Sequence, residues 1–133
     1  MNPKAKIRAL TNAWYGFSLV TLLVQIVGAF LQSGLGFVLA LHVAFLSSIF
    51  LGSLFVAWWV GKLLLGGSSL TRWVVLVVAA IGIAFEALAM VRFVSGPWTT
   101  GTVVSGLLAG CAIWIDLRTM RTLLDRSVKS HFT

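Results

Sequence analysis

Acidic residues are the scarcest chemical class in this chain, which has 3 Asp and Glu among 133 residues. Charged residues of both signs make up only 10% of the sequence, whereas soluble domains carry about 25%. Hydrophobic residues make up 59%, and the mean hydropathy is +1.03. This balance excludes a water-soluble fold, and we expect an integral membrane protein.

Cysteine and histidine are nearly absent as well. The 1 cysteine, Cys111, lies inside an apolar run, which rules out an intrachain disulfide and a cysteine metal cluster and suggests a packing residue. A bis-histidine haem site needs two membrane histidines, but His131 follows the last apolar segment and leaves only His42. The sequence also lacks G-x-S-x-G, H-E-x-x-H and phosphate-loop motifs. We expect no catalytic residue, metal or cofactor, and we favour a non-enzyme over an intramembrane enzyme.

Four apolar segments predict an all-α, polytopic membrane protein with one transmembrane domain over residues 1–133. Glycine, serine and Pro97 separate the segments, and such short joins favour an up-down four-helix bundle. The first segment is longer than the apolar core of a signal peptide and lacks an Ala-x-Ala site, so we expect it to be retained. The predicted helices cover about 12–32, 37–61, 72–94 and 101–122, followed by a basic tail over 117–133.

Lysine and arginine are distributed unevenly among the joins. Of the 10 basic residues, only Arg92 lies in the first or third join. The positive-inside rule then places both termini in the cytoplasm, and we expect a prokaryotic cytoplasmic membrane. The net charge of +7 predicts attraction to anionic headgroups and not nucleic-acid binding. We interpret the tail as a solvated flank near the inner leaflet.

Glu86 is the one acid inside the run 72–92, and an ionisable residue in a span is by default a functional hypothesis. Its depth from the outer membrane boundary matches that of Gln25, His42 and Ser105, so the four could form one polar layer. Arg92 is a possible charge partner above it. A purely structural role for Glu86 remains the alternative, and His42 lies opposite the small-residue face of its own segment.

Small and polar residues mark the faces on which membrane helices pack. The first segment has the clearest stripe, with polar or small residues at spacings of three and four from Trp14 to Gln32. Gly106-x-x-x-Gly110 fits packing within the bundle or a homodimer contact. Asp116, near the inner boundary, is expected to pair with Arg8, Lys62 or Arg72. The predicted helix-packing residues are Ser18, Thr21, Gly28, Gly52, Gly82, Gly106 and Gly110.

Two functions are compatible with these patterns. The first is an accessory, assembly or interaction subunit that acts without catalysis and binds itself or another membrane protein. The alternative is a homo-oligomeric transporter or channel, coupled to protons or cations, that uses Glu86.

Overall fold

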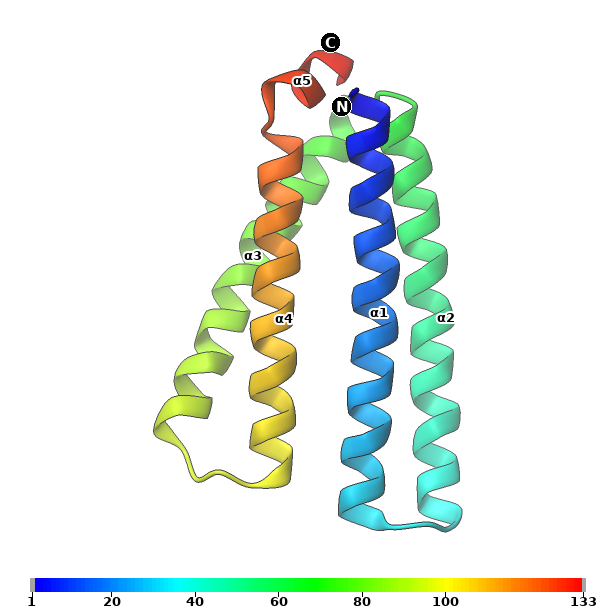
Figure 1. The fold of residues 1–133 in the computed structure, drawn as a ribbon, viewed down its shortest axis with the longest axis vertical. Helices are drawn as coiled ribbons and strands as arrows, with labels where there is room; N and C mark the ends of the chain where they lie inside the picture. The colour runs from blue at the N-terminus through cyan, green and yellow to red at the C-terminus, as the bar shows by residue number, and fades with distance from the viewer. Residues whose placement is uncertain (1, 133) are drawn as a thin grey trace.

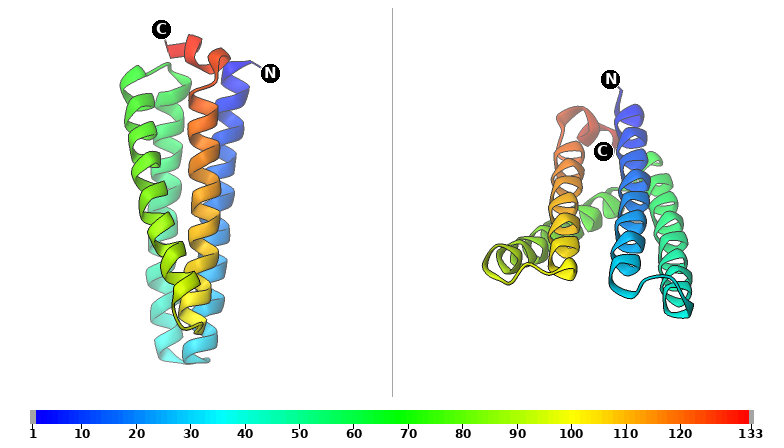
Figure 2. Two further views of the ribbon diagram at one scale, coloured as in Figure 1. Left: turned by 90° about the vertical axis from the view of Figure 1, so that its left-hand side faces the viewer. Right: turned by 60° about the horizontal axis from the view of Figure 1, so that its bottom comes forward.

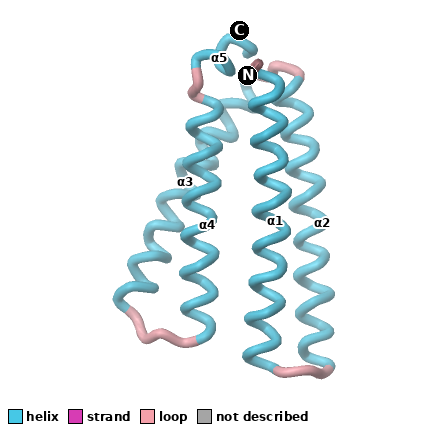
Figure 3. Tube along the Cα trace, in the orientation of Figure 1, coloured by secondary structure: helices cyan, strands magenta, loops and turns pink. Residues whose placement is uncertain are grey.

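Four long helices make up most of the computed structural model, which describes residues 2–132 (Figure 3). All four are long and apolar enough to cross a membrane, so the expectation of an all-helical chain with four candidate spans is confirmed. A short helix, α5 (Arg126–Lys129), and a 3₁₀ turn, η1 (Ser130–Phe132), follow them. The long helices are α1 (Pro3–Ser33), α2 (Phe37–Leu65), α3 (Ser69–Ser95) and α4 (Thr100–Leu123).

Local capping explains where the helices begin and end. The Asn2 side chain accepts the N–H of Ala5 at 2.7 Å, which extends α1 well before the apolar run. After Ser33, Gly34 has a φ of 66°, a conformation that glycine adopts at low cost, and its N–H bonds back into α1. Thr99 and Thr102 form a reciprocal capping box at the start of α4.

The four long helices form two pairs, and one helix of each pair packs against the other pair. α1 packs on α2, α3 packs on α4, and α1 connects the pairs through α4. α3 meets α2 near the loop between them and then diverges from it (Figures 1 and 2). Both termini and the α2–α3 loop lie at one end, which we call the terminal end; the other two loops lie at the distal end (Figure 1).

The largest buried apolar side chains cluster at the terminal end. The side chains of this cluster come from all four long helices and from the segment that follows α4, so residues far apart in sequence meet there. Membrane lipid, not protein, would surround most of the remaining apolar side chains. The core residues are Ile7, Leu10, Leu64, Leu76, Leu123, Val128 and Phe132.

The C-terminal tail folds back onto this core, which differs from the solvated flank that the sequence suggested. Val128 is fully buried and Phe132 is 8% exposed. His131 Nε2 lies 2.9 Å from the carbonyl oxygen of Leu65 at the end of α2. The reason is that α4 ends at Leu123, where the chain turns and brings its last apolar side chains over the helix ends.

Candidate functional site

Two carboxylate residues, Glu86 and Asp116, lie on the facing sides of α3 and α4. A Cβ atom added to Gly82 on α3 would lie 2.6 Å from Oδ2 of Asp116 on α4, so Asp116 fits against the glycine backbone. Glu86 follows Gly82 by one helical turn and therefore lies on the same face of α3. Both residues are half-buried.

Neither carboxylate has a cationic partner within the described chain. The one ion pair among residues 2–132 joins Lys6 to Asp125 at the terminal end. Asp116 therefore does not pair with Arg8, Lys62 or Arg72, as the sequence suggested, because its position on α4 directs it toward α3. Two neighbouring like charges are costly in a low-dielectric setting, and binding a proton or a cation is one way to remove that cost.

No protein-family model matches the chain, and neither a curated protein nor a solved structure is significantly similar to it. The chemistry of the site must therefore be argued from its own residues. Within the described part of the chain, no three His, Cys, Asp or Glu side chains gather as a metal site would require.

The other members of the expected polar layer point in different directions. Gln25 lines a cavity of about 90 Å³ between α1 and α2. His42 is exposed on α2, with Nδ1 3.0 Å from the carbonyl oxygen of Val38 in its own helix. Ser105 is exposed and lines a groove of about 280 Å³ between α3 and α4 together with Arg92. Depth alone suggested one layer, but the four side chains do not converge on one site.

The polar stripe of α1 has two kinds of neighbour. At its terminal end, Trp14 Nε1 donates to Thr119 Oγ1 on α4 at 2.8 Å. In its middle, Ser18 and Thr21 line the same α1–α2 cavity as Gln25. The Thr21 hydroxyl is buried and has no hydrogen-bond partner among the described residues. This stripe therefore joins α1 to both of its neighbours.

Three of the glycines singled out in the sequence lie at helix contacts. An added Cβ on Gly28 would meet Val104 at 3.0 Å, and one on Gly106 would meet the Phe93 ring at 2.6 Å. Gly82 faces Asp116, as described above. Small residues therefore allow the close approach of α1 to α4 and of α3 to α4.

Gly52 and Gly110 behave differently, because an added Cβ at either would have nothing within 4 Å. The two glycines of the G-x-x-x-G pair thus do not act as one packing face within this chain. On α2 the packing face lies nearer the terminal end, where a Cβ on Gly61 would approach Thr11 at 2.8 Å. Sequence reasoning missed Gly61; the spacing of Ala57, Gly61 and Leu64 is the signal that could have found it.

Proposed function

We propose that this chain is an accessory, assembly or interaction subunit of the cytoplasmic membrane, acting without catalysis. In this proposal the helices form an up-down bundle with both termini in the cytoplasm. The clustering of lysine and arginine at the terminal end supports this orientation through the positive-inside rule.

The observation that carries the proposal is the open face of α2. Ala40, Ala44 and Gly52 recur there at helical spacing, and all three are exposed. α3 has few contacts with α2 and diverges from it away from the loop that joins them, so α2 packs mainly against α1 (Figure 2). Small residues let membrane helices approach closely, and a partner helix could therefore pack against this face of α2.

Co-purification of the tagged full chain from native membranes tests this proposal. We expect the chain to be recovered with a partner or as an oligomer, and Gly52→Leu to abolish that recovery by filling the close-packing face. Gly16→Leu is the matched control, since an added Cβ at Gly16 also meets nothing within 4 Å. Recovery of the wild-type chain only as a lone monomer would contradict the proposal.

The acid pair favours a second candidate, a homo-oligomeric transporter or channel coupled to protons or cations. Glu86 and Asp116 would hold the proton or cation between α3 and α4, and a second copy would complete the pathway. Carboxylates inside membrane spans commonly mark such pathways.

Ion flux into liposomes containing the purified chain distinguishes this candidate from the first. We expect Glu86→Gln and Asp116→Asn each to abolish flux while the chain stays folded. Asp125→Asn removes the remaining acid at the protein surface and should leave flux unchanged. If wild-type liposomes show no flux of protons or cations, the transport function should be abandoned.

A further inference from the structure

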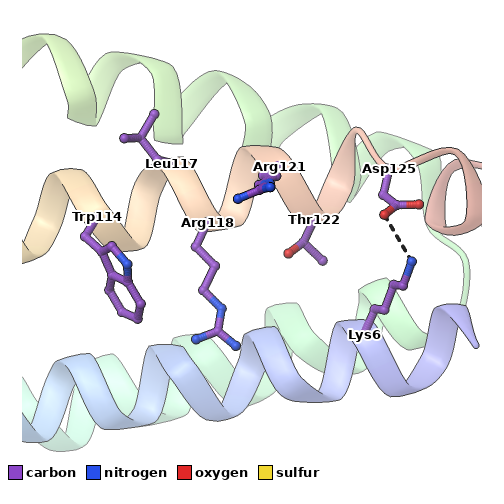
Figure 4. A pocket seen from close by; sticks show the side chains of 7 residues that line it. All are labelled: Lys6, Trp114, Leu117, Arg118, Arg121, Thr122 and Asp125. Carbon is purple, nitrogen blue, oxygen red and sulfur yellow. Dashed lines mark hydrogen bonds and ion pairs between the residues drawn. The ribbon is translucent and has the colours of Figure 1, made fainter. Parts of the chain in front are cut away.

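A basic groove runs between α1 and α4 at the terminal end (Figure 4). It has a volume of about 580 Å³ and is lined by the cations Lys6, Arg118 and Arg121 and by one acid, Asp125. Three positive charges and one negative charge leave the groove with a net charge of +2. The groove therefore has the charge to attract an anion.

Two of the three cations remain available for that anion. Lys6 Nζ is held 3.0 Å from Asp125 Oδ2 and donates to Ser127 Oγ at 2.7 Å. Arg118, in contrast, lies over the Trp114 ring at 5.5 Å, and its guanidinium extends toward α1 (Figure 4). Neither Arg118 nor Arg121 has a hydrogen bond or ion pair within the described residues. Their spacing of three residues places both on one face of α4.

Toward the distal end, the same side of the α1–α4 contact is lined mainly by apolar side chains. A groove of about 560 Å³ is lined by Val27 and Leu31 of α1 and by Val103 and Leu107 of α4. Helical spacing places Val103, Leu107 and Arg118 on one face of α4. Arg118 and Leu107 are separated by about 16 Å along the helix axis, roughly one leaflet of a 30 Å hydrocarbon core.

We propose that one anionic phospholipid, from the leaflet at the terminal end, binds along the α1–α4 groove. Its phosphate lies between Arg118 and Arg121, where guanidinium groups can form paired hydrogen bonds to phosphate oxygens. Its acyl chains lie over Trp114 and reach the apolar groove at Leu107. A soluble phosphate would use the arginines but not the apolar groove, so a lipid accounts for both parts of the surface.

Native mass spectrometry of the purified full chain in detergent tests this site. Phosphatidylglycerol should bind about tenfold or more tightly than phosphatidylcholine with the same acyl chains, because the choline cation of phosphatidylcholine offsets the phosphate charge and is repelled by the two arginines. The double variant Arg118→Gln/Arg121→Gln should remove this preference. The matched control, Arg126→Gln/Lys129→Gln, removes the same charge from exposed positions on α5 and should keep it. Equal loss in both double variants would overturn the site in favour of general attraction.

A second variant tests the acyl-chain part with the arginines intact. Leu107→Trp should fill the apolar groove and weaken phosphatidylglycerol binding severalfold. Leu88→Trp, on an exposed face of α3, should not weaken it. Displacement of the lipid by millimolar inorganic phosphate, or equal binding of phosphatidylcholine by the wild-type chain, would overturn the proposal.

Discussion

The terminal and distal ends of this molecule are built from the same four helices but are held together differently. At the terminal end, apolar side chains from five helices and a turn meet in one buried cluster. At the distal end, the helices approach each other closely at glycines, as at Gly28 to Val104 and at Gly106 to Phe93. Large side chains there, including Leu35 and Phe37, are 84% and 76% exposed.

The terminal cluster therefore holds the fold together, whereas the exposed side chains of the distal end can contact other molecules. The terminal cluster sets the angle between the α1–α2 and α3–α4 pairs, because it is the region where α2 and α3 both take part. Toward the distal end the two pairs can rest against lipid or a partner helix. Substitutions at the two ends should therefore differ in kind, as the following variants would show.

The largest effect is expected from truncating a core side chain at the terminal end. Leu64 is fully buried, and Leu64→Ala should lower the free energy of unfolding by about 2–5 kcal/mol through lost packing and a cavity. The neighbouring Leu63 is 39% exposed, so Leu63→Ala is the control and should cost much less. Equilibrium unfolding in mixed detergent micelles measures both. Equal losses would mean that the cluster does not stabilise the fold.

The sequence predicts the number and rough limits of the spans because apolar length and punctuation suffice for that. It does not predict which helices pack against each other. The candidate site depends on that packing, because its residues come from two helices. Asp116 lies against Gly82, one turn from Glu86, only because α3 packs on α4. Depth placed His42 beside Glu86, but depth says nothing about the direction in which a side chain leaves its helix. The orientation of the chain in the membrane stays a prediction.

The C-terminal tail is a second case in which the sequence alone does not predict the tertiary contacts. Its basic charges suggested a solvated flank near the inner leaflet. Phe132 and Val128, however, are far from the first helices in sequence, and their burial requires the turn after Leu123. Asp125 caps α5 by accepting the N–H of Ser127 at 2.9 Å, a local signal that the sequence contains.

A second effect concerns the buried cation of the terminal end. Arg72 is 4% exposed; its Nε donates to the carbonyl oxygen of Leu123 at 2.9 Å, and its guanidinium lies 5.8 Å from the Phe132 ring centre. Arg72→Met keeps most of the apolar volume but leaves the carbonyl without this donor, which should cost about 1–3 kcal/mol. Thermal unfolding in detergent measures the loss. Arg92→Met, on an exposed side chain, should change stability little.

Smaller changes in stability are expected for two glycine-to-alanine substitutions in α4. One should destabilise the protein and the other should stabilise it. In Gly106→Ala the new methyl would lie 2.6 Å from the Phe93 ring, so α3 and α4 must separate at a cost of about 1–2 kcal/mol. In Gly110→Ala the methyl meets open space, and the better helix propensity of alanine should stabilise the chain by about 0.5–1 kcal/mol. Matched unfolding curves measure both changes. If both substitutions stabilised the protein, α3 and α4 would not approach closely at Gly106.

The smallest effect is a loosening of the tail at acid pH. Hydrogen bonds from Ser127 and Lys6 lower the pKa of Asp125 from 3.8 to about 2, and this residue lies beyond the last span. Because the folded pKa is depressed, the stabilisation is complete above the unfolded value and is lost as the pH falls from about 4 toward 2. The protection factors of the α5 amides against hydrogen exchange should therefore fall over that range. In Asp125→Asn the α5 amides should lack this protection at every pH. A wild-type tail whose protection factors did not change across this range would show that the Lys6–Asp125 contact does not hold it.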